Sequence, residues 1–240
     1  MWVLESLSGT LLNALTVLIG GLMGVFLGER LPKRIHDSLF GVLGLFTILI
    51  GLLDAFTTKS PLVLLGSLLL GTLIGEWLNL EDQLNRFGDT IQRKLARPGS
   101  TVSEAFVTST LVFCIGPLSI LGALDNGLSG DITKLAIKAV LDGFAALAFS
   151  AALGWGVLLS VFVILAYQGT ISLCAGILAP ILHSNPATIT ELTATGGLIL
   201  VAIGLKLLKI RDLRVANLIP ALALAPAIVT LLSVASNLLR

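Results

Sequence analysis

The chain is a succession of long apolar runs separated by short polar segments. A helix needs about 20 apolar residues to cross the hydrocarbon core of a membrane. The runs therefore predict eight transmembrane helices, at residues 9–28, 36–56, 61–79, 104–124, 133–153, 155–182, 192–210 and 214–238. The spans have to be helical, because irregular backbone facing lipid would leave N–H and C=O groups unpaired. We predict an all-α polytopic transmembrane helix bundle, with residues 1–240 forming a single membrane domain.

Composition agrees with this membrane assignment. Hydrophobic residues make up 55% of the chain and charged residues 12%, whereas about a quarter of the residues of soluble domains carry charge. The net charge of +1 gives no electrostatic reason to expect a nucleic-acid partner. Cys114 and Cys174 lie in apolar runs without the spacing of a metal or redox site, so we expect small packing residues and no metal site. The expected partner is the lipid bilayer.

The basic residues predict the orientation of the chain. Eleven of the fifteen Lys and Arg residues fall in three alternate connections, at residues 30–34, 86–97 and 206–214. The positive-inside rule places these connections in the cytoplasm and both termini outside. The middle connection, residues 80–103, repeats apolar residues at helical spacing among charges, which predicts an amphipathic cytoplasmic connector on the membrane surface.

Two short sequence matches raise the hypothesis of an internal repeat. Residues 44–52 of the second span resemble residues 197–205 of the seventh, and Gly9-Thr10 is echoed by Gly169-Thr170. If spans one to three correspond to spans six to eight, the odd offset of five makes the copies inverted, as in many secondary transporters. Chance agreement of Gly and Leu in lipid-facing helices is the alternative.

The fifth span carries the charges that suggest a site. Lys134, Lys138 and Asp142 follow one another at intervals of four residues, which places them on one helical face. A charge at membrane depth costs about 2.5–3.5 kcal/mol or more, so Asp142 is expected to face protein or water. Intramembrane charges are functional candidates by default. The alternative is a structural Lys138–Asp142 ion pair with Lys134 extended toward the interface.

The polar segment before this span offers a further carboxylate. Residues 125–131 concentrate acidic residues and glycines, whose oxygens suit a hard cation. For Asn126 and Asp131, a turn followed by a helix cap at Asp131 is the favoured interpretation. Asp125, still attached to the fourth span, is the better candidate, at an outer entrance.

Three spans contain helix-breaking residues near their middles. Gly116-Pro117 interrupts the fourth, Gln168-Gly169-Thr170 the sixth, and Pro220 with Pro226 the eighth, just after Asn217. Backbone carbonyls freed at such breaks are tolerated where they are buried or line a cavity, which makes them natural cation or substrate ligands. Plain kinks packed against neighbouring helices are the alternative. Asn13 lies deep enough in the first span to belong to the same site.

Other features favour packing over chemistry. Gly20, Gly24 and Gly28 recur at four-residue spacing, as do Gly71 and Gly75, which allows close helix contact within one subunit or between two copies of a homo-oligomer. Among enzyme signatures, residues 127–130 spell the GxSG of intramembrane serine proteases. Ser129 would need a base, and His183, the one histidine expected on the same membrane face, lies in a loop and not in the middle of a helix. Because no catalytic geometry is indicated, we predict that the protein is not an enzyme.

Seven segments spread over nearly the whole chain carry a family resemblance. They are residues 9–14, 75–82, 113–116, 125–131, 138–143, 167–169 and 214–220. Together they resemble the YdfK/YqgA-type family of bacterial membrane proteins of unknown function. The chain departs from the expected pattern at Gly116-Pro117, where a small or apolar residue is expected after the glycine. The resemblance implies a bacterial cytoplasmic (inner) membrane location and no cofactor, and it implies no particular activity.

The leading hypothesis is a secondary transporter or ion-translocating membrane protein with a cation or small-solute site near the bilayer midplane. Asp142 would be the cation or proton ligand, and Lys138 would keep it charged when the site is empty. The other predicted site residues are Gln168, Gly169, Asn217 and Asn13, with Asp125 toward the outer entrance. The alternative is a non-transporting membrane scaffold or regulator whose connector at 80–103 recruits a partner.

Overall fold

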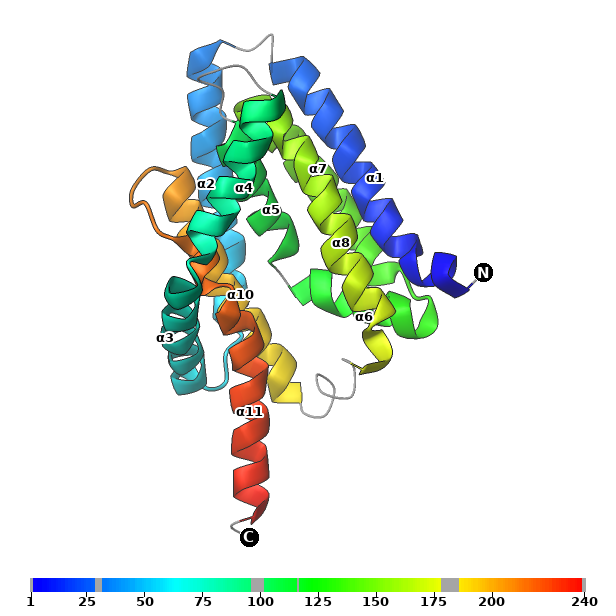
Figure 1. Ribbon diagram of the computed structural model, residues 1–240, viewed down its shortest axis with the longest axis vertical. Coiled ribbons are helices and arrows are strands. Elements are labelled where there is room, and N and C mark those ends of the chain that lie inside the picture. Colours follow the sequence, from blue (N-terminus) through cyan, green and yellow to red (C-terminus); the bar gives the residue numbers. More distant parts are fainter. Residues whose placement is uncertain (1, 29–31, 96–101, 116, 178–185, 239–240) are drawn as a thin grey trace.

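A computed structural model describes residues 2–28, 32–95, 102–115, 117–177 and 186–238, and in these ranges the chain is helical without strands (Figure 1). The α-helices are α1 (Trp2–Gly28), α2 (Lys33–Ala55), α3 (Pro61–Leu78), α4 (Leu80–Leu95), α5 (Val102–Cys114), α6 (Pro117–Ser129), α7 (Thr133–Leu153), α8 (Ser160–Leu173), α10 (Pro186–Leu207) and α11 (Pro220–Leu238). Two 3₁₀ turns, η1 (Trp155–Leu159) and η2 (Val215–Leu218), lead into α8 and α11.

The helices account for the apolar runs of the sequence. Six helical segments of the described chain are long and apolar enough to cross a membrane, and α5 with α6 makes a seventh if this pair, bent by 60°, is one span. The apolar part of α2, Gly41–Ala55, is shorter. The prediction of an all-α bundle of about eight membrane helices is confirmed.

Glycines bring α1 and α7 into backbone contact. A Cβ atom on Gly20 would lie 2.1 Å from the Gly143 carbonyl oxygen, and one on Gly24 would lie 2.2 Å from the Leu147 carbonyl oxygen. The partner residues rise in step, so the two helices run parallel. Because such distances exclude any side chain, the glycine spacing serves packing within this chain, as the sequence predicted.

The glycines of the suspected repeat face one another. Helices α2 and α10 pack closely, with Gly51 against the Gly197 carbonyl oxygen and Gly204 against the Gly44 carbonyl oxygen, at 2.6 and 2.8 Å from the added Cβ atoms. The two helices are antiparallel, so the start of each matched segment packs against the end of the other. An inverted repeat with its twofold axis between α2 and α10 would produce this arrangement, and the repeat itself stays a hypothesis.

Two of the three predicted interruptions lie elsewhere. Helix α8 runs unbroken through Gln168–Thr170, and the irregular backbone instead precedes it, at Gly154 (φ +85°) and η1. Pro220 begins α11 after the η2 turn, and Pro226 lies within the continuous helix, where the break had been expected. A proline at the first helical position fits because its missing N–H has no partner to lose there.

The break in the fourth span is confirmed. Helices α5 and α6 meet at 60° around Gly116, which itself lies outside the described residues. On the α6 side, the Ser119 hydroxyl donates a hydrogen bond to the Phe113 carbonyl oxygen (2.9 Å) and so caps a carbonyl near the end of α5. The bend therefore lies where a side chain replaces a lost backbone hydrogen bond.

The α1–α7 contact yields a stability prediction. We expect Gly20→Ala to lower the free energy of unfolding by about 1–3 kcal/mol, because its methyl group would overlap the Gly143 backbone and force the helices apart. Gly66→Ala on α3 is the matched control, since nothing lies within 4 Å of its added Cβ. Thermal unfolding in detergent measures both, and equal midpoints for the two variants would contradict the packing described.

Candidate functional site

Four of the predicted site residues meet inside the bundle. Lys138 donates a hydrogen bond to Asp142 Oδ2 from the preceding turn of α7. Asn13 of α1 donates from its amide nitrogen to Asp142 Oδ2 (3.1 Å) and to Gln168 Oε1 of α8 (3.3 Å). Asn13 and Gln168 are completely buried, and Lys138 and Asp142 are 6% and 7% exposed. We call these four residues the midplane cluster, after the depth that the sequence predicted for the site.

The midplane cluster keeps two polar atoms without a partner. Asp142 can only accept hydrogen bonds when ionised, which orients the Asn13 amide with its nitrogen toward the carboxylate. In the described part of the chain, Asn13 Oδ1 then lacks a donor and Gln168 Nε2 lacks an acceptor. An unpaired buried polar group costs free energy, and most such groups are paired with protein or water. The cluster therefore has a spare acceptor and a spare donor beside an ion pair.

Helices α5 and α6 both pack against α7, the helix that carries Lys138 and Asp142. Gly169, the residue after Gln168, was expected to interrupt its helix and does not. It lies within unbroken helix, and the nearest atom to a Cβ placed on it is a Leu7 methyl group at 3.5 Å. Helical hydrogen bonding therefore engages the carbonyls predicted to complete the site.

Asp125 lies apart from the midplane cluster. It forms an ion pair with Lys134 across the α6–α7 connection, and both side chains are partly exposed. Asp131 accepts a hydrogen bond from the Thr133 N–H (2.9 Å) at the start of α7, although the N-cap position of this helix is occupied by Ile132 and not by Asp131, where the cap was predicted. Hydrogen bonds from Thr133 also lower the pKa of the Asp131 carboxyl. Ser129 donates to the Asp125 carbonyl oxygen, and its proposed base, His183, lies outside the described residues.

Asn126 does not lie in a turn, contrary to the expectation. It is fully buried in α6, and its side chain contacts the first turns of α1. Its Oδ1 accepts from the Gly9 N–H (3.1 Å), and its Nδ2 donates to the Glu5 carbonyl oxygen (2.9 Å) and to Ser8 Oγ (3.3 Å). The DNG pattern is typical of a turn, but tertiary hydrogen bonds to α1 stabilise the helix here.

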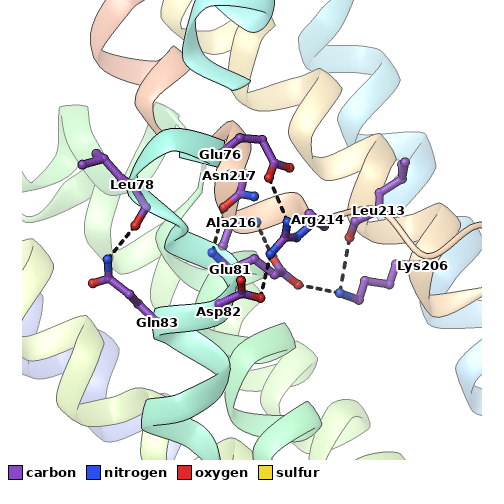
Figure 2. A network of polar contacts seen from close by, with 10 residues as sticks. All are labelled: Glu76, Leu78, Glu81, Asp82, Gln83, Lys206, Leu213, Arg214, Ala216 and Asn217. Carbon is purple, nitrogen blue, oxygen red and sulfur yellow. Dashed lines mark hydrogen bonds and ion pairs between the residues drawn. The ribbon is translucent and has the colours of Figure 1, made fainter. Parts of the chain in front are cut away.

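Asn217 belongs to a second polar cluster, at the junction of α3, α4, α10 and η2 (Figure 2). Asn217 Oδ1 accepts from the Glu81 N–H (2.8 Å). The buried Glu81 carboxylate in turn accepts from the Ala216 N–H (2.8 Å) and pairs with Lys206 (2.8 Å). A Cβ on Gly75 would lie 2.0 Å from the Asn217 carbonyl oxygen. We call Glu81, Lys206, Ala216 and Asn217 the junction cluster. The structure therefore places Asn217 in the junction cluster and not beside Asp142.

A surface layer of ion pairs covers the junction cluster. Arg214 reaches Glu76 at the end of α3 (2.8 Å) and Asp82 at the start of α4 (2.6 Å), and all three side chains are substantially exposed. Figure 2 shows Arg214 between these two carboxylates. Exposed pairs of this kind contribute little individually. The buried Glu81 is therefore the member that anchors α4 to the 3₁₀ turn before α11.

Sequence reasoning missed the burial of Glu191. This carboxylate, next to the start of the predicted span at 192–210, is fully buried in α10. It accepts hydrogen bonds from the Thr58 hydroxyl (2.7 Å) and from the N–H groups of Lys59 (2.8 Å) and Ser60 (2.9 Å). A carboxylate at free N–H groups just before a helix stabilises that helix end. The missed signal was the Thr-Lys-Ser-Pro turn opening α3, which needs an acceptor.

The junction cluster generates a stability prediction. We expect Glu81→Gln to lower the free energy of unfolding by about 3 kcal/mol, the typical cost of removing one member of a buried ion pair. Asp82→Asn, one residue away and 46% exposed, is the control and should cost less than about 1 kcal/mol. Chemical denaturation in detergent compares the two. A Glu81→Gln protein as stable as Asp82→Asn would show that the junction contributes little.

Known proteins similar to this chain have no assigned activity. The family described as "Protein of unknown function (DUF554)" matches residues 8–230. The chain is 29% identical over 226 residues to "Uncharacterized membrane protein YdfK" of Bacillus subtilis (strain 168), covering 92% of this chain and 95% of the relative. It is 32% identical over 222 residues to "Uncharacterized protein YqgA" of Escherichia coli (strain K12), covering 90% and 94%. No solved structure matches it significantly. The chain belongs to the DUF554 family of membrane proteins, as the resemblance predicted.

Proposed function

We propose that this protein translocates a small cation across the membrane through the midplane cluster. The observation that carries the proposal is the buried Lys138–Asp142 pair, joined by amides from two other helices and keeping a spare acceptor and a spare donor. A carboxylate oxygen and an amide oxygen, here on Asp142 and Asn13, are ligands that hard cations prefer. The cluster therefore offers a cation two oxygen ligands at membrane depth.

The cost of the cluster supports a functional role. A purely structural ion pair contributes little to stability, since desolvation offsets most of its Coulombic attraction. Replacing such a pair by apolar residues of similar size is often neutral or stabilising. Charged residues within membrane spans accordingly tend to mark ion pathways and proton relays. The unpaired Asn13 Oδ1 and Gln168 Nε2 atoms add a further free-energy cost. Apolar residues at these positions would pack without that cost.

The Lys138–Asp142 contact suggests how transport would be coupled. Lys138 occupies Asp142 Oδ2, so a cation bound there would face a second positive charge a few ångströms away in a poorly screened interior. Release of the Lys138 proton would restore neutrality. The cluster would then exchange one monovalent cation for one proton, without changing its own net charge.

The proposed location is the bacterial cytoplasmic membrane, with the basic connections inside. The relative whose printed name includes "membrane" comes from a bacterium. The helix directions support the alternating topology, because α1 runs parallel to α7 while α2 runs antiparallel to α10. The positive-inside rule then places both termini outside.

A flux assay tests the role of Asp142. In proteoliposomes carrying an outward Na⁺ or K⁺ gradient and an internal pH dye, we expect the wild-type protein to acidify the lumen. We expect Asp142→Asn to reduce the rate at least about tenfold, as for loss of an interaction worth about 1.4 kcal/mol or more. The carboxamide keeps the shape of Asp142 but not its charge.

Asp125→Asn is the matched control for this assay. Its carboxylate also pairs with a lysine, but that pair lies partly exposed at the α6–α7 connection. It should transport at nearly the wild-type rate. Wild-type flux in Asp142→Asn would refute the proposed site, and a wild-type protein silent toward both cations would count against cation transport.

A second prediction concerns the lysine. If cation binding displaces a proton from the midplane cluster, the thermal stabilisation given by Na⁺ or K⁺ should be greater at higher pH, because fewer protons then compete with the cation. Lys138→Arg should fold but lose this stabilisation at every pH, since a guanidinium does not deprotonate in proteins. Lys134→Arg is the control and should behave as wild type. Cation stabilisation retained in Lys138→Arg would exclude the exchange.

A non-transporting scaffold is the second candidate. The observation that favours it is the direct Lys138–Asp142 contact, in which each charge has its counterion within a single helix. The charged connector helix α4, which packs against α5 and η2, would then be the part that recruits a partner. Normal folding without cation flux or cation stabilisation is the result this candidate predicts.

A further inference from the structure

We propose that the midplane cluster is reached from the α6–α7 face of the protein, along a polar path between α1, α6 and α8, and that Asn126 holds this path closed. The inference rests on the proposed function for what travels along the path, namely water and a small cation. The path itself is argued from the buried side chains on either side of Asp142.

On α1 the path is a stripe of buried polar residues. Ser6, Thr10 and Asn13 recur at helical spacing on one face, and all three are buried. The next position of the same stripe is Val17, which is buried and apolar. The polar character of this face therefore runs from the N-terminal end of α1 to the level of the midplane cluster and stops there.

Helix α8 shows the same change of character at the same level. Ser172 and Gln168 are buried polar residues one turn apart, and Ile164, one turn further, is buried and apolar. Ser172 donates a hydrogen bond to the Ala123 carbonyl oxygen of α6 (2.8 Å), which places it at the junction of the three helices. Helices α1, α6 and α8 all contact one another.

Polar atoms without partners lie along this path. In the described chain, Thr10 Oγ1, Asn13 Oδ1 and Gln168 Nε2 are buried without a hydrogen-bond partner. They come from two facing helices and lie at or outward of Asp142. Buried polar atoms are normally satisfied by protein or by water. Four further buried side-chain atoms of the described residues lack a partner elsewhere, on Thr110, Ser150, Thr188 and Asn217. The three on the path are set apart by their position on the facing polar stripes of α1 and α8, where water or an ion could satisfy them.

One turn beyond Asp142 the interior is apolar, with Val17, Ala146 and Ile164 all buried. One turn further along α7, the buried Phe149 is followed by Ser150, which is buried and has no hydrogen-bond partner for its hydroxyl. Phe149 packs edge-on against Phe113 of α5, with ring centroids 6.1 Å apart. The apolar turn lies between the midplane cluster and the opposite face, which favours the α6–α7 face as the side of access once the path opens.

Asn126 is placed to close the path. Its amide makes three hydrogen bonds to the first turns of α1, at Gly9, Glu5 and Ser8. Figure 1 shows the N-terminal end of α1 beside α6. The other half of α1 is held by glycine contacts to the α7 backbone, at Gly20 and Gly24. Loss of the Asn126 hydrogen bonds would therefore weaken the attachment of the N-terminal half of α1 to α6, while its contact with α7 at Gly9 and Leu135 stays in place.

Cysteine labelling tests the path independently of transport. In a background with Cys114→Ala and Cys174→Ala, single cysteines replace Thr10, Ser172, Val17 and Ile164. The reagent is a membrane-impermeant, cationic methanethiosulfonate, added to sealed vesicles of either orientation. Ser129→Cys and Asp212→Cys, both at exposed positions, report which face is accessible.

We expect Thr10→Cys and Ser172→Cys to react from the face that labels Ser129→Cys, and Val17→Cys and Ile164→Cys to remain unlabelled. Adding Asn126→Ala should raise the Thr10→Cys labelling rate about fivefold, the change expected when a hydrogen bond of ordinary strength is lost. Asn126→Ala should not expose Ile164→Cys.

Thr10→Cys and Ser172→Cys that stay unlabelled while Ser129→Cys reacts would overturn the path. Labelling of Val17→Cys and Ile164→Cys as fast as that of Thr10→Cys and Ser172→Cys would also overturn it. Unchanged Thr10→Cys labelling in Asn126→Ala would exclude the closing role. Because labelling needs no flux, a labelled path with no cation transport would leave the path standing and remove the proposed function.

Discussion

A carboxylate and an ammonium group in the middle of a membrane helix have to be solvated by the protein itself. Asp142 and Lys138 lie within α7, where exposure to lipid would cost about 2.5–3.5 kcal/mol per charge or more. The Asn13 amide of α1 donates to the Asp142 carboxylate in place of water, and the Gln168 amide of α8 accepts from Asn13 and so helps to orient it. The arrangement of these three helices is therefore the condition on which the candidate site depends.

That arrangement requires helix backbones to approach more closely than side chains permit. Glycines on α1 meet the α7 backbone, and glycines on α2 and α10 meet each other. Since lipid tails are as apolar as leucine, close packing and interhelical hydrogen bonds, more than hydrophobic burial, hold helices together in a bilayer. Along α1, the glycines that contact the α7 backbone lie in the C-terminal half and the buried polar stripe lies in the N-terminal half.

The sequence predicted what depends on length and periodicity, and failed where tertiary contacts decide. The helical bundle follows from the lengths of the apolar runs. The glycine face of α1 and the pairing of Lys138 with Asp142 follow from four-residue spacing along one helix. Asn13 was identified from its depth, although its partner could not be. Asn217 was misplaced because proline suggested a mid-span break, whereas Pro220 begins a helix after a turn that hydrogen-bonds to Glu81. Such contacts join residues more than a hundred positions apart and leave no local pattern.

The central claim is that a cation can take the place of the Lys138 ammonium at Asp142. A structure of the lipid-embedded protein at alkaline pH, with Tl⁺ as a heavy monovalent cation, tests this most directly. The account predicts Tl⁺ density between the Asp142 carboxylate and Asn13 Oδ1, with Lys138 withdrawn from Asp142. An unchanged Lys138–Asp142 contact without Tl⁺ density at saturating concentration would contradict it.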